Sequence, residues 1–291
     1  MTSCIHRRDL LKWSLAAAAA PALCGCVATN AATGRSSFTG FYSVEDDIRI
    51  GRQEAPKLVA SFGGVYDDPR LQRYVEQIGR RAAAHAEYQQ YPYTFTIVNS
   101  PTVNAFALPG GPVFVTRGLV SLASSEAELA GVISHELGHV NARHSAERQS
   151  QGLLAQIGAA AVGIAAGGEL GRLAAQGAAA YITSYSRDQE FEADKLGVRY
   201  MSRANYDPDK MASFLDSLRD HSKVEAKMMG LPPGKVDEFN INATHPRTVE
   251  RVEAAAQLSA GLRPADPVIN RQQHLDHING LIYGDDPKQG I

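Results

Sequence analysis

The sequence predicts an α+β fold that is mostly helical, with a small β-sheet beside one central helix. Apolar residues recur at helical spacing through most of residues 44–262, whereas only the runs 93–98 and 112–116 have the pattern of β-strands. No segment of about 20 to 50 residues repeats along the chain of 291 residues. A chain of this length can form one hydrophobic core, so we expect a single globular domain over 44–262.

The helical periodicity divides into stretches separated by polar residues, glycine and proline. They are 44–60, 69–87, 118–123, 125–148, 170–204, 208–222 and 246–260. Ser125 with Glu128 three residues on is a capping-box signature, and the apolar residues that follow it at helical spacing predict a buried helix. In the stretch 170–204, the small residues Ala193 and Gly197 let another helix approach closely.

The buried helix 125–148 contains the sequence H-E-L-G-H at residues 135–139. His135 and His139 share one helix face about 5 to 6 Å apart, so both rings can reach one zinc ion. Glu136 lies between them and is the expected general base, which indicates hydrolysis of a peptide bond. The alternative is a surface helix with two ordinary histidines. The buried character of the helix weighs against it, because buried histidines need partners.

A catalytic zinc site takes three protein ligands and leaves its fourth position for water. On a continuous helix His144 would lie half a turn off the face of His135. Glu190 and Asp194 share a face of the second long helix, whereas Glu192 would look outward. We therefore predict Glu190 as the third ligand and Asp194 as an acceptor that orients a ligating imidazole. The alternative is a solvated pair of carboxylates.

Five segments of the sequence form a series of motifs, and two of them contain the candidate zinc ligands. They are NAFALPGG (104–111), VFVTRG (113–118), HELGHVNARHS (135–145), SRDQEFEADKLG (186–197) and THP (244–246). In this order they resemble the zinc metallopeptidases of the HtpX and CAAX prenyl protease type, a branch of the gluzincins, over roughly residues 40 to 260. The resemblance implies a zincin-like domain that holds one Zn²⁺ through His135, His139 and Glu190, with Glu136 as general base and Asp194 in support.

The resemblance implies three further roles. Arg251 resembles the arginine of the family's C-terminal segment and is expected to stabilise the oxyanion. The segment Asn104, Ala105 and Phe106 is expected to form a sheet edge along the cleft that pairs with an extended substrate. Its alternative is a hairpin that only packs on the helix. His245 is expected to occupy the open zinc position and hold the enzyme latent, the alternative being a histidine that caps the next helix.

The first 25 residues have the composition of a signal peptide. Arg7 and Arg8 precede an apolar run over 10–23, which is too short to span a bilayer well. The segment HRRDLLK resembles a twin-arginine signal, and an ordinary positive n-region is the alternative. The sequence LCGC ending at Cys26 resembles a bacterial lipobox, which predicts lipidation of Cys26 and an outer-membrane anchor facing the periplasm. Plain cleavage with a soluble product remains the alternative, and residues 26–43 are expected to be a linker.

Three regions outside the motifs add further expectations. Of 29 basic and 31 acidic side chains, three and one lie in residues 1–25, which leaves 26 and 30, a net charge of −4, so nucleic acid is not an expected partner. Within the Ala- and Gly-rich residues 152–180, the apolar run 153–168 is too short for a membrane span. A lid over the cleft, a buried hairpin and a patch for homo-oligomerisation remain open for them. Residues 263–291, with His274 and His277, are expected to be a solvated tail.

These observations predict a zinc endopeptidase of the cell envelope whose substrates are unfolded or misassembled envelope proteins. The alternative from another class is an envelope chaperone or assembly factor that retains zinc for structure and rarely cuts. A structural zinc site closes with four ligands and has no use for a general base such as Glu136, which favours the enzyme.

Overall fold

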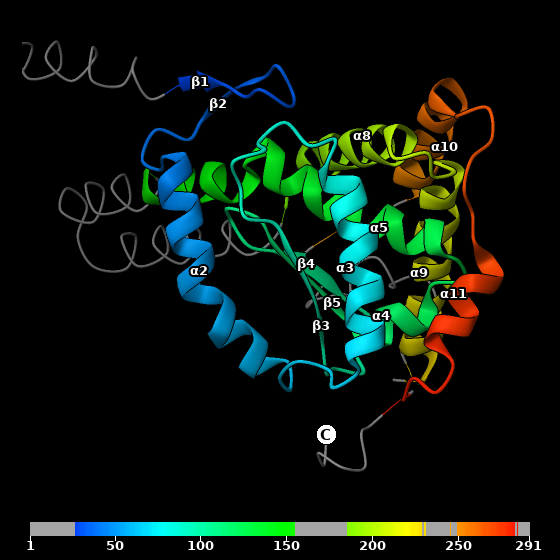
Figure 1. The fold of residues 1–291 in the computed structure, drawn as a ribbon. Coiled ribbons are helices and arrows are strands. Elements are labelled where there is room, and N and C mark those ends of the chain that lie inside the picture. The colour runs from blue at the N-terminus through cyan, green and yellow to red at the C-terminus, as the bar shows by residue number, and fades with distance from the viewer. Residues whose placement is uncertain are drawn as a thin grey trace, which may run out of the picture.

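A computed structural model describes residues 27–154, 185–228, 230, 245, 249–282 and 284. The predicted signal peptide, Cys26 and most of residues 152–180 lie outside the described residues. Helices surround the central helix α5, and a three-stranded sheet lies beside it (Figure 1). The predicted α+β, mostly helical fold is thereby confirmed. In the part of the chain that is described, no helix combines the length and the apolar character needed to cross a membrane.

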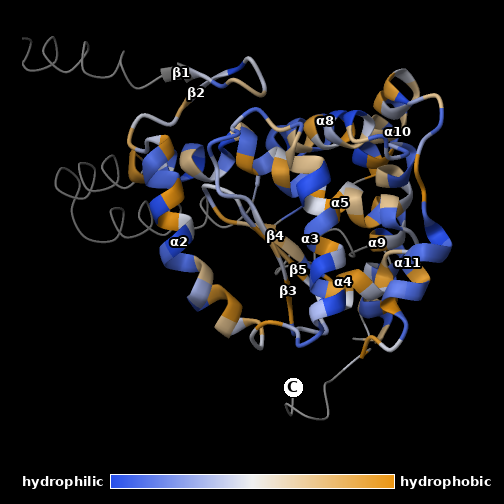
Figure 2. Ribbon diagram, viewed as in Figure 1, coloured by the Kyte–Doolittle hydropathy of each residue, from blue (hydrophilic) through white to orange (hydrophobic). Residues whose placement is uncertain are grey.

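The elements carry the labels of Figure 1. In chain order they are β1 (Val27–Thr29), β2 (Ser36–Phe38), α2 (Val44–Ser61), α3 (Pro69–Ala83), β3 (Thr94–Val98), β4 (Ala105–Ala107), β5 (Pro112–Thr116), α4 (Arg117–Leu122), α5 (Glu126–Ala142), α8 (Arg187–Arg203), α9 (Asp209–Met228), α10 (Val249–Leu262) and α11 (Arg271–Ile278). In Figure 2, β5 is coloured mainly hydrophobic, while α11 and the visible side of α3 are coloured mainly hydrophilic, as expected for a buried strand and two outer helices.

The helix α5 forms the centre of the core. Every one of its residues except Val132 is buried. It begins at Ser125, whose Oγ accepts a hydrogen bond from the backbone N–H of Glu128 at 3.2 Å. The Glu128 carboxylate accepts from the backbone of Ser124 at 2.8 Å, one residue earlier than in the predicted capping box. The first bond satisfies an N–H group that the first helical turn leaves unpaired, and the second holds the chain just before the helix.

Two glycines allow α5 and α8 to pack closely. A Cβ atom on Gly138 of α5 would lie 2.6 Å from the carbonyl oxygen of Ala193 on α8. A Cβ atom on Gly197 of α8 would lie 3.0 Å from the backbone nitrogen of His135. The prediction that small residues let a second helix approach is confirmed, and the approach brings the two motif-bearing helices together.

The helix predicted over 125–148 is interrupted. Arg143 adopts the left-handed conformation with φ of 57° and ends α5, and helical structure resumes over 144–154. The Arg143 side chain donates to Asp47 Oδ2 at 2.6 Å and to the carbonyl oxygen of Tyr42 at 2.8 Å. These tertiary bonds hold a conformation that arginine rarely adopts on its own.

The other predicted helices differ from the structure mainly at their ends. The stretch predicted over 170–204 does not run through Tyr185 and Ser186, which are not helical. Ser186 is instead the N-cap of α8 and forms a capping box with Gln189. The helix α3 ends at Ala83, before the predicted end at 87.

The sheet has the strand order β3-β5-β4. Strands β3 and β5 are parallel, and β4 is antiparallel to β5. A turn at Pro109-Gly110-Gly111 joins β4 to β5, with φ of 76° at Gly110 and 116° at Gly111, values that favour glycine. Because β4 is outermost, one side of it is an edge of the sheet.

Both ends of the described chain pack on the domain, which differs from the expected linker and solvated tail. Part of the linker forms the β1–β2 hairpin, in which Asn30 is buried. In the tail, His274 of α11 is buried, with Nδ1 3.0 Å from the hydroxyl of Tyr74 and Nε2 2.9 Å from the carbonyl oxygen of Ala123. Non-local polar contacts of this kind leave no periodic pattern in the sequence.

Candidate metal centre

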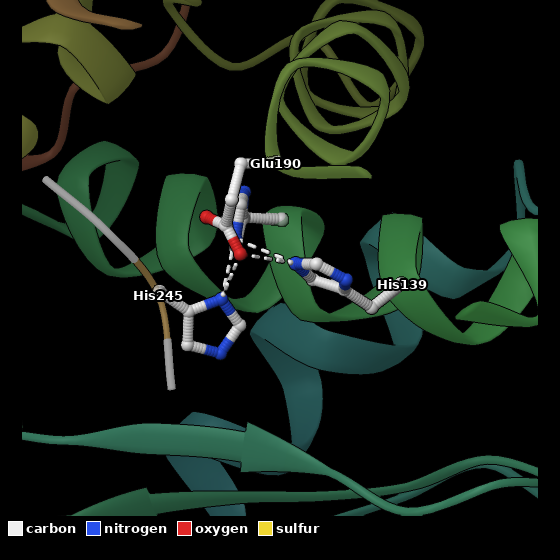
Figure 3. A group of neighbouring side chains, drawn as sticks. His139, Glu190 and His245 are labelled. Atoms are coloured by element: carbon white, nitrogen blue, oxygen red, sulfur yellow. Dashed lines mark hydrogen bonds and ion pairs between the residues drawn. The ribbon is translucent and has the colours of Figure 1, made fainter. Parts of the chain in front are cut away.

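Four side chains from three parts of the chain meet at one point. His135 and His139 come from α5, Glu190 from α8, and His245 from the stretch before α10. One donor atom from each lies within 4.8 Å of the others. These four residues are referred to as the metal group. Figure 3 shows the imidazoles of His139 and His245 pointing toward the Glu190 carboxylate.

The separations of the three predicted ligands fit a tetrahedral ion. Nε2 of His135 lies 3.0 Å from Nε2 of His139 and 3.5 Å from Oε2 of Glu190, and Nε2 of His139 lies 3.4 Å from Oε1 of Glu190. Two donors bound to zinc at roughly 2.0 to 2.2 Å in tetrahedral geometry are about 3.3 to 3.6 Å apart. The set can therefore hold a metal with small adjustments.

His245 occupies the remaining side of this group. Its Nδ1 lies 3.3 Å from Nε2 of His135 and 2.8 Å from Oε1 of Glu190, and its Nε2 lies 3.5 Å from Oε1 of Glu136. Burial alone would lower the pKa of His245, but the carboxylates of Glu190 and Glu136 outweigh it and raise the pKa. The structure thus brings together the residue expected as fourth ligand and the three others.

Glu136 lies at the edge of the same group and is buried. Its Oε2 has no hydrogen-bond partner among the residues that the structure describes. A buried carboxylate oxygen without a partner is costly, so it is suited to a water molecule that donates to it.

The Nδ1 atom of His135, which points away from the other three metal-group residues, contacts an ion-pair network. Nδ1 of His135 lies 2.8 Å from Oδ1 of Asp194, so the residue predicted to orient a ligating imidazole is in contact with one. Nε of Arg251 donates to Oδ2 of Asp194 and Nη2 donates to Oδ1, each at 2.7 Å, and Nη1 forms an ion pair with Glu190. Burial would raise the pKa of Asp194, but Arg251 outweighs it and lowers the pKa.

The guanidinium of Arg251 is buried and contacts two carboxylates. Arg251 also lines the cavity beside the metal ligands, and its expected role in stabilising the oxyanion stays a prediction. The geometry fits an arginine that fixes Asp194 and Glu190, because a bidentate guanidinium sets the plane of the carboxylate it binds.

The outer nitrogen of His139 has a partner that the sequence did not reveal. Nδ1 of His144 lies 2.8 Å from Nδ1 of His139, and Nε2 of His144 lies 2.9 Å from Oε2 of Glu192. Burial lowers the pKa of His139, which keeps it in the neutral form that binds metals. The helix break at Arg143 turns His144 toward His139. A left-handed residue at a helix end is usually glycine or asparagine, so arginine at this position gave no sign of the break in the sequence.

An aromatic ring also covers His139. The ring of Tyr185 stacks on its imidazole with centroids 3.8 Å apart. Tyr185 was not among the predicted site residues. It directly precedes the N-cap of α8, a position that a sequence pattern does not associate with the site.

A cavity beside the metal group is lined by β4, α5 and α9. Asn104 and Ala105 lie on one side, and His135 and Glu136 on another. Asp194, His245 and Arg251 also line the cavity, and its remaining walls are mainly apolar: Leu119, Val132, Met211, Phe214, Leu215 and Leu218. A second hollow, beyond His245, is lined by Phe106, Ala107 and Tyr185 among others. The predicted edge segment Asn104, Ala105 and Phe106 therefore borders hollows on both sides of His245.

A buried cluster of possible metal ligands, flanked by a buried carboxylate and a sheet edge, is typical of metallopeptidases. Residues 69–259, about two thirds of the chain, match the family model of Peptidase family M48. The chain belongs to Peptidase family M48.

Curated relatives agree with this assignment. The Beta-barrel assembly-enhancing protease of Yersinia pestis is 31% identical over 80% of this chain and 48% of the relative. The protein of the same name from Escherichia coli strain K12 is 29% identical over 76% of this chain and 45% of the relative. The Mitochondrial metalloendopeptidase OMA1 of Schizosaccharomyces pombe is 30% identical over 62% of this chain and 50% of the relative. The chain spans about half the length of these relatives.

The N-terminal segment also matches a known pattern. Residues 4–23 match the twin-arginine translocation signal sequence. Of the two alternatives for the pair Arg7 and Arg8, this match favours the twin-arginine signal, and it points to the cell envelope as the location of the protein.

Proposed function

We propose that this protein is a zinc endopeptidase that cleaves unfolded or misassembled proteins in the periplasm. The observation that carries the proposal is the spacing of the donor atoms of His135, His139 and Glu190, which at 3.0 to 3.5 Å is close to the edge length of a zinc tetrahedron, with Glu136 beside them. The relatives named for β-barrel assembly support envelope β-barrel proteins as one substrate class.

The residues divide the chemistry among them. His135, His139 and Glu190 would hold one zinc ion, which when bound supplies positive charge that polarises the scissile carbonyl and acidifies water. Glu136 takes the proton of the attacking water through Oε2 and later returns it to the leaving amine. Asp194 keeps the Nε2 lone pair of His135 directed at the metal, because it holds the proton on Nδ1.

The edge strand β4 offers backbone groups to an extended substrate. Thr116 donates to the carbonyl oxygen of Asn104, and Leu108 donates to that of Pro112. By antiparallel alternation the backbone groups of Ala105 and Ala107 then face the free edge. Ala105 N–H is engaged by Oδ1 of Asn104, so a substrate would pair with the other groups of these two residues. The apolar cavity beside Glu136 suits a bulky apolar side chain next to the cleaved bond.

A digestion assay tests the proposal. The protein purified from cells expressing the full chain, with zinc, is expected to digest unfolded casein. Glu136→Gln is expected to bind zinc and to lose this activity, while Glu225→Gln, on the exposed side of α9, is the matched control and keeps it. Equal digestion by Glu136→Gln and the wild-type protein would refute Glu136 as the base.

His245 is proposed as a latch that keeps the enzyme latent. Its Nδ1 takes the side of the metal group that a catalytic site leaves for water. His245→Ala is accordingly expected to raise casein digestion while about one zinc per chain is retained. Loss of digestion with zinc still bound would instead make His245 a contact to the substrate or transition state.

The same four-donor arrangement favours a second function, that of an envelope chaperone or assembly factor with a closed structural zinc site. The two functions predict opposite results for His245→Ala. A chaperone gains no proteolysis from the opened position, and it keeps its effect on the assembly of envelope proteins when Glu136 is replaced by Gln.

An outer-membrane lipid anchor at Cys26 is also proposed, from the LCGC sequence after the apolar run. Cys26→Ser is expected to move the protein from the membrane pellet to the soluble fraction. A protein that stays in the pellet after this substitution is attached in another way, for example through association with itself or with other envelope proteins.

A further inference from the structure

The β1–β2 hairpin docks on the two helices that carry the metal group. Asn30 Nδ2 donates to the carbonyl oxygen of Asn141 on α5 at 2.9 Å. Arg199 Nη2, from α8, donates to the carbonyl oxygen of Ala32 at 3.1 Å. Asn30 and Ala32 are both buried, so the hairpin has a defined place against α5 and α8.

Arg35, which precedes β2 in this hairpin, holds two carboxylates together. Its Nη1 donates to Oε1 of Glu147 at 2.9 Å, and Nη2 donates to Oε2 of Glu147 at 2.8 Å. The same Nη2 donates to Oε2 of Glu192 at 3.1 Å. Glu147 is buried and also accepts from Gln189 at 3.0 Å. One guanidinium therefore neutralises part of the charge of two neighbouring carboxylates, which would otherwise repel each other.

Glu192 continues this network to the metal group. His144 Nε2 lies 2.9 Å from Oε2 of Glu192, and His144 Nδ1 lies 2.8 Å from Nδ1 of His139. A carboxylate accepts only, so His144 carries its proton on Nε2 and is an acceptor at Nδ1. His139 then carries its proton on Nδ1, which leaves the lone pair of Nε2 for the metal.

We propose that Arg35 of the hairpin is a positioning residue for the zinc site, acting through Glu192 and His144 to fix the tautomer and ring orientation of His139. The proposal rests on the zinc site proposed above. By this proposal the β1–β2 hairpin supports the metal centre and is more than a linker between the predicted signal peptide and the domain.

A purely structural ion pair is the competing explanation. The side chain of Arg35 is 43% exposed but that of Glu147 is only 6% exposed, so loss of Arg35 is expected to cost some stability by leaving a buried carboxylate without its main partner. The positioning role has a different consequence. Without Arg35 the carboxylate of Glu192 is free to turn away, and His144 then loses the acceptor that fixes its tautomer. His144 can then carry its proton on Nδ1, which would repel the protonated Nδ1 of His139 that lies 2.8 Å away.

The test measures zinc affinity by competition with a chelator, and the visible spectrum after cobalt(II) replaces zinc. Arg35→Ala is expected to weaken zinc binding by about tenfold and to change the cobalt spectrum, as loss of an outer partner of a metal ligand does. His144→Phe removes the acceptor itself and is expected to weaken binding by about 10- to 100-fold. Arg35→Lys, which keeps the charge, is expected to restore part of the affinity.

Controls separate this inference from other failures. Arg80→Ala removes an exposed arginine that pairs with Glu76 on α3, and it is expected to leave affinity and spectrum unchanged. The unfolding temperature of the metal-free protein is measured in parallel, because a purely structural ion pair would lower that temperature in Arg35→Ala and leave the zinc affinity and cobalt spectrum of the folded protein unchanged. Wild-type affinity and an unchanged cobalt spectrum in Arg35→Ala would overturn the positioning role, while absence of zinc binding by the wild-type protein would overturn the zinc site itself.

Discussion

Replacing Gly138 by alanine tests whether the close packing of α5 on α8 sets the geometry of the metal group. The added Cβ would lie 2.6 Å from the carbonyl oxygen of Ala193, whereas ordinary contacts begin at 3.4 Å. The deficit of about 0.8 Å is against backbone, so no side chain can rotate to relieve it and the helices must separate. Gly138 adjoins His139, and Ala193 adjoins Asp194. A misplacement of about 1 Å between catalytic groups costs roughly 100-fold in rate.

The stability cost of this substitution is expected to be smaller than its effect on activity. Overpacking costs about 1 to 3 kcal/mol, and alanine returns about 1 kcal/mol of helix propensity. We therefore expect Gly138→Ala to fold, with kcat/KM on an unfolded substrate reduced about 100-fold and zinc bound more weakly. Gly261→Ala on α10, where a Cβ meets nothing within 4 Å, is the matched control. Unchanged activity and zinc affinity in Gly138→Ala would refute the reasoning.

The remaining predictions concern ligands, supporting residues and pH. Glu190→Ala is expected to lose zinc, measured as metal per chain; full retention would move the third ligand elsewhere, with Asp194 the first candidate. Asp194→Ala is expected to weaken zinc binding by about 10- to 100-fold in chelator competition. Burial lowers the pKa of His274, so the stability it contributes is complete above about pH 6.5 and declines as the pH falls below it. The free energy of unfolding should therefore change less between pH 7.5 and 5.5 in His274→Gln than in the wild type.

The central part of the site could be predicted because its signals are local. The spacing of His135 and His139 within one buried helix, and of Glu190 and Asp194 within another, depends only on helical geometry. Gly197 indicated the close approach of these helices for the same reason, since the lack of a side chain is visible in the sequence.

The supporting residues were missed because they depend on tertiary contacts. The break at Arg143 is held by bonds to Asp47 and to the backbone of Tyr42, about 100 positions earlier in the chain. With the break unrecognised, His144 was assigned to the wrong face of a continuous helix. The expected solvated tail was wrong for a similar reason, because His274 is buried by a non-local bond to Tyr74.

The charges of the site explain why its supporting network is so extensive. Glu136, Glu190 and Asp194 are all buried, and together they carry three formal negative charges. Arg251 contacts two of these residues and supplies one positive charge, which leaves two negative charges to be balanced when the imidazoles are neutral. Buried charge without compensation costs several kcal/mol per ion. A divalent cation removes this imbalance, so chelation is expected to lower the stability of the folded protein as well as its activity, and the loss should be larger when the positive charge of Arg251 is absent.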